Sequence, residues 1–116
     1  MNTKGYGDMS KRTKAASIPP KVKDAVFERD DHKCIWCGHY GYRSWACAHW
    51  ISRAQGGLGI EENILTLCPD CHREYDNGTD REGMKEYFRQ YLSYRYKREI
   101  REKDVKYNKW KGIFDD

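Results

Sequence analysis

The sequence predicts an α+β fold of one domain, in which helices flank a short two-stranded hairpin and four cysteines brace that hairpin. The cysteines form two Cys-x-x-Cys pairs, Cys34 with Cys37 and Cys68 with Cys71, separated by 30 residues. A glycine-rich connection at residues 53–62 lies between two short apolar stretches, and apolar residues recur at helical spacing on either side of this region. The length of 116 residues suits a single domain.

The first part of the chain predicts an arm followed by a helix. Residues 1–18 are polar and basic with almost no apolar periodicity, which is typical of a mobile N-terminal arm. Pro20 suits the first turn of a helix that covers roughly residues 20–31. The apolar residues of this helix share one face: Val22, Val26 and Phe27.

Residues 19–79 should form the core, with the hairpin at its centre. The first strand is expected from Trp45 to Ile51 and the second from Ile64 to Leu67. Alternation along the first strand would place Cys47, His49 and Ile51 on one side, and Ala46, Ala48 and Trp50 on the other.

Two helices are predicted after the second strand. Pro69 opens a short helix that ends at Asn77-Gly78. Asp80 can cap a longer helix from about 81 to beyond 100, within a basic C-terminal region of helix and tail at residues 80–116. Apolar residues recur along this helix at helical spacing: Met84, Phe88, Tyr91 and Leu92.

The paired cysteines predict a structural Zn²⁺ site, because four thiolates supply the tetrahedral cage that zinc prefers. Only 38% of the residues are hydrophobic and the mean hydropathy is −1.06, so a bound metal would contribute to stability. We find no run apolar enough to span a bilayer and no signal-peptide core, so a cytoplasmic location with reduced cysteines is expected. The fifth cysteine, Cys47, is expected to be a packed core residue.

The charge is unevenly distributed, although the net charge is only +4. Residues 1–23 carry a net charge of +5, residues 24–80 of −5 and residues 81–111 of +6. Basic ends around an acidic centre suit a polyanionic ligand such as nucleic acid. Alternatively, the two basic segments are solvated and keep the chain soluble.

Five separated features occur in the order and spacing of a known nuclease family: the first cysteine pair, His49, Gly56-Gly57, Asn63, and the second cysteine pair followed directly by His72. They resemble the HNH endonucleases, which have the ββα-metal (His-Me finger) fold, in the version that carries a four-cysteine zinc site. The resemblance covers roughly residues 25–78. The stretch 48–78 is most similar to small HNH proteins of bacteriophages and prophages.

The resemblance implies a role for four residues. His49 occupies the place of the general base, and His72 the place of a ligand to the catalytic metal. Asp76 follows His72 by one helical turn and could bind the same ion. Asn63 would tie down the loop between the strands. From the residues alone, His49 could instead be a packed strand histidine and His72 a surface histidine. Asp76 and Asn63 are also common turn residues.

One position departs from the family pattern. The resemblance implies an Asp or His before the base that contributes to the metal, but Ala48 has no donor atom. Cys47 is expected to be a poor substitute, since it should lie on the other side of the strand from position 48. The catalytic ion would then be held by His72 and Asp76 with water or substrate, and Mg²⁺, Mn²⁺ or another first-row ion would suit these donors.

Several cations are candidate DNA contacts. Arg53 and Arg73 are expected near the phosphodiester bond that is cleaved. Cations at the end of the long helix could follow the DNA backbone: Arg95, Lys97, Arg98 and Arg101. Alternatively, these are an exposed loop arginine and the solvated face of an amphipathic helix.

The function that the sequence predicts is a metal-dependent endonuclease that hydrolyses DNA and nicks one strand at a time. The phage-like resemblance implies a packaging protein, such as a phage terminase, as a partner, and the host cell cytoplasm as the location. The alternative is a non-catalytic zinc module that binds DNA or a protein on the same scaffold. A nuclease that acts on RNA is a third possibility.

Overall fold

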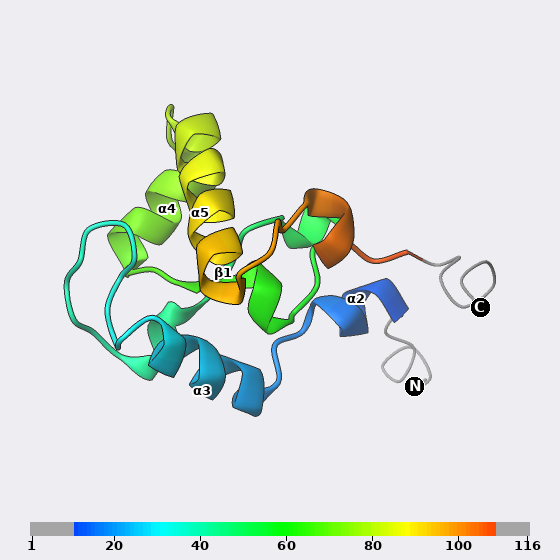
Figure 1. Cartoon of the computed structure of the whole chain (residues 1–116), viewed down its shortest axis with the longest axis horizontal. Helices are drawn as coiled ribbons and strands as arrows, with labels where there is room; N and C mark the ends of the chain where they lie inside the picture. Colours follow the sequence, from blue (N-terminus) through cyan, green and yellow to red (C-terminus); the bar gives the residue numbers. More distant parts are fainter. Residues whose placement is uncertain (1–10, 109–116) are drawn as a thin grey trace, which may run out of the picture.

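The computed structural model describes residues 11–108 and arranges helices around a small two-stranded sheet. Helix α3 packs on one side of the strands, while α4 and α5 lie side by side on the other (Figure 1). The predicted α+β class and the strand–strand–helix order of the core are confirmed. The helices and strands, in chain order, are α2 (Lys11–Ala16), α3 (Pro20–Arg29), β1 (Ala46–His49), β2 (Ile64–Thr66), α4 (Pro69–Asn77) and α5 (Arg81–Tyr96).

The two strands are antiparallel and pair Ala48 with Leu65 and His49 with Ile64. The register shifts before Ala48, which leaves Cys47 at an irregular position. Burial alternates along β1: Ala46 and Ala48 are buried, whereas Cys47 and His49 are partly exposed. The strand therefore has a core side and a second side that carries Cys47 and His49, as predicted.

The first strand is shorter than predicted, because regular pairing ends at His49. Trp50 and Ile51 both turn into the main hydrophobic core, where Ala48 also lies. Ile51 therefore does not share the side of His49, and that part of the prediction is wrong. The alternation of a strand no longer applies once the chain leaves the sheet.

Helix α3 begins at Pro20 as expected and ends at Arg29, two residues before the predicted end. Its predicted apolar face is confirmed. Val26 is fully buried against Ala46 and Ile64, and Val22 and Phe27 pack around this cluster. The helix thereby packs against both strands of the hairpin.

Residues 11–16 form helix α2, so the expectation of a mobile arm is wrong for this segment. Residues 1–10 of that arm lie outside the described residues. Residues 11–16 are helical because of a tertiary contact that local composition does not reveal. Ala16 is buried, and the Gly59 amide donates a hydrogen bond of 2.8 Å to the Ala15 carbonyl. The glycine-rich connection thus gives the helix a surface on which to dock.

Helix α5 starts at Arg81 as predicted but ends at Tyr96 rather than beyond residue 100. Lys97 has a φ of 54°, a left-handed conformation that ends the helix. The chain then turns back, and its next apolar residues are fully buried in the core that also holds the buried face of α5. These residues are Ile100 and Val105 from the returning segment, and Met84, Phe88 and Leu92 from α5.

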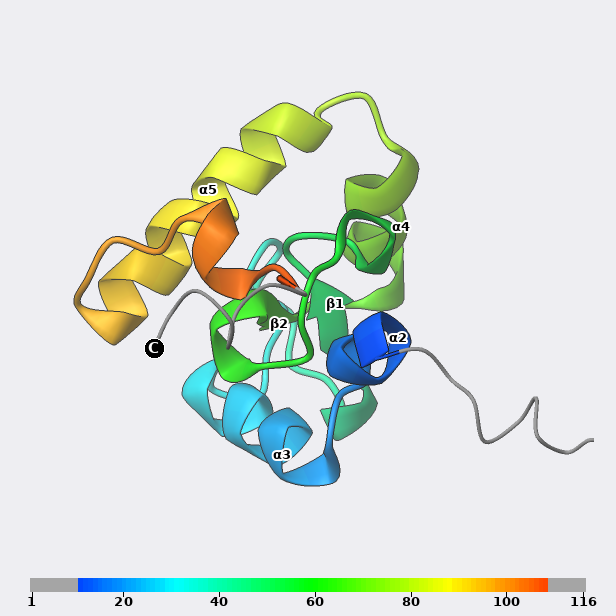
Figure 2. The same ribbon diagram turned by 90° about the vertical axis from the view of Figure 1, so that its right-hand side faces the viewer.

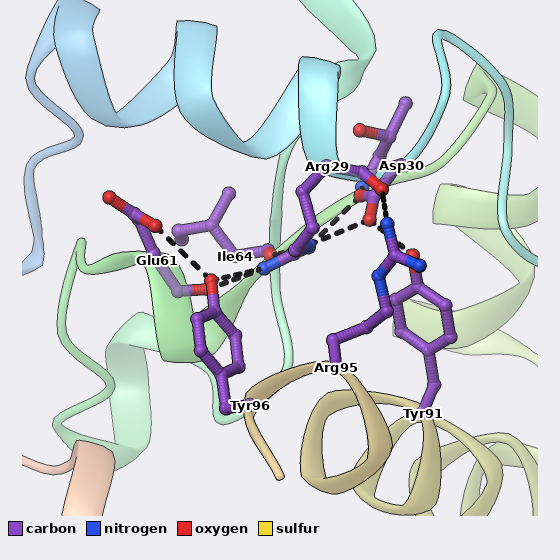
Figure 3. A network of polar contacts seen from close by, with 8 residues as sticks. Arg29, Asp30, Glu61, Ile64, Tyr91, Arg95 and Tyr96 are labelled. Carbon is purple, nitrogen blue, oxygen red and sulfur yellow. Dashed lines mark hydrogen bonds and ion pairs between the residues drawn. The ribbon is translucent and has the colours of Figure 1, made fainter.

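A buried polar network ties α3 to α5 and β2 (Figure 3). The fully buried Asp30 carboxylate accepts two hydrogen bonds from Arg29, one of 2.5 Å from the Tyr91 hydroxyl and one of 3.0 Å from the Thr66 amide. Arg29 also donates to the hydroxyl of Tyr96. Burial alone would lower the pKa of the Arg29 guanidinium, but the hydrogen bonds and charges of Asp30 and Tyr96 together outweigh burial and raise it. The network fixes the far end of α5 against the hairpin.

Within residues 11–108, no helix combines the length and the apolar character that a crossing of the bilayer requires.

Candidate zinc centre and active site

The four paired cysteines meet at one point of the fold. Cys34 and Cys37 lie in the loop after α3, and Cys68 and Cys71 lie at the start of α4. All four Sγ atoms lie within 4.8 Å of one another, and those of Cys37 and Cys68 are 3.9 Å apart. A tetrahedral zinc with Zn–S bonds of about 2.3 Å would place its sulfur ligands about 3.8 Å apart. The donor set and the spacing therefore fit a structural zinc ion.

The backbone around the cluster also favours thiolates. The Cys37 amide lies 3.5 Å from Cys34 Sγ, and the Cys71 amide lies 3.4 Å from Cys68 Sγ. In each pair, one amide thus points at the first sulfur, which stabilises negative charge there. Because Cys68 also caps α4, the zinc cluster fixes where this helix begins.

A cavity of about 550 Å³ lies where β1 faces α4. It brings the predicted base, His49, together with the predicted metal ligands, His72 and Asp76. Figure 2 shows α2, β1 and α4 grouped on one side of the molecule. The side chains that line the cavity are Ile18, Cys47, His49, Ser52, Arg53, Ala54, His72, Asp76 and Arg81.

His49 enters the cavity from the last position of β1 and is partly buried. Its Nε2 lies 2.9 Å from the carbonyl oxygen of Ala16. Burial lowers the pKa of His49 below its usual 6.5, and the charges of Arg53 and His72 act in the same direction. The Ala16 carbonyl and Asp76 oppose this shift without reversing it. His49 is therefore a neutral imidazole at neutral pH, the form that can accept a proton.

His72 and Asp76 come from the same face of α4, one turn apart. His72 Nε2 lies 3.5 Å from Asp76 Oδ2. Both side chains are partly exposed to the cavity, so a ring nitrogen and a carboxylate oxygen are available on one side of it. The helix that begins at the zinc cluster thus carries both predicted ligands of the catalytic ion to the site.

Position 48 lies away from the cavity. Ala48 is fully buried and belongs to the main core with Trp50 and Tyr75. Cys47, which was expected to be a packed core residue and a poor replacement for a donor at position 48, instead lines the cavity beside His49. The expectation of a packed Cys47 is wrong because β1 is irregular at this residue and buries its two neighbours.

Asn63 ties the loop between the strands to β1. Its side-chain oxygen accepts a 2.8 Å hydrogen bond from the Ile51 amide. Its side-chain nitrogen donates to the carbonyls of Ile51, at 3.1 Å, and Leu58, at 2.9 Å. Asn63 is fully buried, so no water replaces these partners. Its position agrees with the structural role that the resemblance implies.

Replacing Asn63 by alanine is expected to lower the free energy of unfolding by about 3 kcal/mol, because buried backbone groups of Ile51 and Leu58 would lose their partners. Urea titration followed by circular dichroism measures the change. The control is Gln55→Ala, an exposed residue in the same loop that should change stability by less than about 0.5 kcal/mol. Equal unfolding midpoints for the two variants would contradict the role of Asn63.

The structure brings one of the predicted DNA contacts to the cavity, namely Arg53. Arg73 is exposed and pairs with Asp70 at 2.6 Å. The other predicted contacts lie at the opposite end of α5 and do not line the cavity. Among these, Arg95 donates to the Arg29 carbonyl, Lys97 is exposed at the helix end, and Arg98 pairs with Glu62 at 3.2 Å.

Two features of the site escaped the sequence prediction. Arg81 lines the cavity from the first position of α5, with its guanidinium 4.9 Å from the ring centroid of Tyr75. Asp80 indicated where α5 starts, although its side chain makes no capping hydrogen bond, but it did not indicate that this start lies beside α4. The second feature is the Ala16 carbonyl, which belongs to the segment that was expected to be mobile.

Comparisons with known proteins match the part of the chain that contains His49, His72 and Asp76. The family model of the HNH endonucleases matches residues 34–78. The chain is also similar to Anaredoxin from Nostoc sp. (strain PCC 7120 / SAG 25.82 / UTEX 2576), with 29% identity over 58 residues that make up 50% of this chain and 75% of that protein. No solved structure matches the chain significantly.

The matched residues include the zinc cluster, both strands and α4. They indicate a nuclease-type or nucleic-acid-related function with a zinc site. Residues 34–78 of this chain are therefore similar to the HNH endonucleases, in the variant whose four cysteines fit a zinc ion.

Proposed function

We propose that this chain is a metal-dependent endonuclease that hydrolyses DNA phosphodiester bonds and nicks one strand at a time. One observation carries the proposal. A partly buried histidine of β1 faces the same cavity as a histidine and an aspartate of α4: His49, His72 and Asp76. A base beside a pair of metal-binding side chains is the minimum that metal-assisted hydrolysis requires.

The division of labour follows from the chemistry of each group. His49 accepts the proton of the attacking water, because its lowered pKa keeps the ring neutral. His72 and Asp76 would hold a divalent ion such as Mg²⁺ or Mn²⁺, since they offer nitrogen and oxygen donors from one helix face. When bound there, the ion supplies stabilisation of the negative charge that develops on the phosphate and on the leaving oxygen.

Two arginines give the cavity its affinity for a phosphodiester. Arg53 and Arg81 both line it, from the loop after β1 and from the start of α5. Guanidinium groups pair well with phosphate oxygens and would orient the strand across His49. Arg73 and the cations near the end of α5 would contact the DNA backbone farther from the cleaved bond: Arg95, Lys97 and Arg98.

The pH dependence of cleavage is expected to follow the neutral form of His49. Because the pKa of His49 lies below 6.5, the rate should be constant around neutral pH and fall as the pH decreases through that pKa. Initial rates of plasmid nicking between about pH 5 and 8 measure this profile. A rate that still rises steeply above pH 7 would contradict the role given to a depressed His49 pKa.

A cleavage assay tests the function. Supercoiled plasmid and single-stranded RNA are each incubated with the zinc-loaded protein and Mg²⁺, Mn²⁺ or Ni²⁺. The proposal expects nicked circles and intact RNA. Tight DNA binding without cleavage by any ion would favour the alternative, a non-catalytic zinc module. Cleavage of RNA alone would reassign the substrate. The comparisons give no support to a phage terminase as partner.

A further inference from the structure

We propose that helix α2, which precedes the matched domain, is part of the site: the Ala16 carbonyl holds the proton of His49 on Nε2 and so leaves Nδ1 free as the base. The catalytic meaning of this inference rests on the proposed function. The contact itself does not, because it can be measured without any cleavage. Ala16 is thus a positioning residue that acts through its backbone.

The tautomer follows from the chemistry of the contact. A carbonyl oxygen only accepts hydrogen bonds, so His49 Nε2 must donate across the 2.9 Å separation. A neutral imidazole carries a single N–H, and Nδ1 is then the unprotonated nitrogen. Without this partner the ring would divide between two tautomers and turn more freely. Fewer molecules would then present the same nitrogen to water.

Contacts on several sides of α2 hold the carbonyl in place. The Arg12 Nη2 atom donates a 2.6 Å hydrogen bond to the Ala54 carbonyl. The Gly59 amide donates to the Ala15 carbonyl at 2.8 Å. Ile18 packs against the cluster of α3 and the strands while also lining the cavity. The helix is therefore anchored to the loop between β1 and β2 and to the core beneath it.

Gly59 is the point at which this docking is most sensitive. A Cβ atom at Gly59 would lie 2.0 Å from the Ser17 carbonyl oxygen and 2.9 Å from that of Ala16. These neighbours are backbone atoms and cannot move aside as a flexible side chain would. Any larger residue must push the end of α2 away from the loop. Gly59 does not line the cavity, so its substitution changes the position of the Ala16 carbonyl without altering a group that touches substrate.

The test compares the zinc-loaded wild type of 116 residues with Gly59→Ala. Long-range ¹⁵N–¹H NMR spectra at neutral pH report the tautomer of His49, and plasmid nicking gives kcat and KM. We expect a single Nε2–H tautomer in the wild type and a mixture in the variant. We also expect kcat to fall by at least about tenfold while KM for DNA is unchanged, since part of the general-base contribution is lost. Ser17→Ala is the matched control, because it keeps the backbone carbonyls and should behave as wild type.

Arg12→Ala provides a second, milder disturbance of α2, and it carries the test if Gly59→Ala does not fold. Like Gly59→Ala, it should produce a mixture of His49 tautomers and a lower kcat. A wild-type His49 protonated on Nδ1 would overturn the inference, as would variants with wild-type spectra and rates. Faster cleavage by the variants would also overturn it, because α2 would then obstruct the site. If the wild type does not cleave DNA at all, the proposed function fails while the NMR result still decides the contact.

Discussion

Replacement of His49 by alanine is expected to slow plasmid nicking by about 10²–10⁴-fold, the usual contribution of a general base. The fold should survive, because His49 is only partly buried and its side chain is held by a hydrogen bond to the Ala16 carbonyl rather than by core packing. Binding to DNA should also persist, since Arg53 and Arg81 remain on the cavity. The loss is therefore expected in kcat rather than in KM.

The matched control is His32→Gln. His32 is an exposed histidine that pairs with Glu28 and does not line the cavity. The two variants and the wild type are compared by their initial rates of conversion of supercoiled to nicked plasmid. Thermal unfolding is measured in parallel. Rates that are equal for His49→Ala and His32→Gln would remove His49 from the chemistry.

Replacement of Cys34 or Cys71 by serine is expected to unfold the protein or cause it to aggregate. Structural zinc sites contribute about 10–16 kcal/mol of binding free energy, whereas a domain has only about 5–15 kcal/mol of net stability. The cluster joins the loop after α3 to the start of α4, and Cys34 is itself fully buried in the core. Loss of one ligand would thus release both the hairpin and the helix that carries His72.

Metal analysis should find about one zinc ion per wild-type chain. The control variant is Cys47→Ser, whose side chain lies outside the cluster and lines the cavity. It should keep its zinc and melt near the wild-type temperature. A wild type without zinc, or Cys34→Ser and Cys71→Ser variants that both melt like the wild type, would contradict the four-thiolate site.

Local patterns were sufficient to predict the parts of the site that lie within the matched domain. The cysteine spacing indicated the cluster, and its Sγ atoms do converge. Alternation along β1 indicated that Cys47 and His49 face away from Ala46 and Ala48. Pro69 marked the start of α4, and helical spacing placed His72 and Asp76 on one face. Apart from the meeting of the two cysteine pairs, which are 30 residues apart, each of these inferences depends on residues close in sequence.

The remaining parts depend on contacts between distant segments. Residues 11–16 have no apolar periodicity, but Gly59 offers them a docking surface 40 or more residues later in the chain. Helix α5 stops at Tyr96 because Ile100 and Val105 return to the core, which the helical spacing of the earlier residues does not indicate. Arg81 reaches the cavity because α5 packs beside α4. Such contacts between distant segments can be identified only from the folded structure.

The most direct measurement of the central claim is whether DNA ligase reseals the product that this protein makes from supercoiled plasmid. The account predicts nicked circles in the presence of a divalent ion, with the 5′ phosphate and 3′ hydroxyl that ligase requires, so that added ligase closes them. Plasmid that remains supercoiled at protein concentrations that retard it on a gel would contradict the account, as would nicks that ligase cannot close.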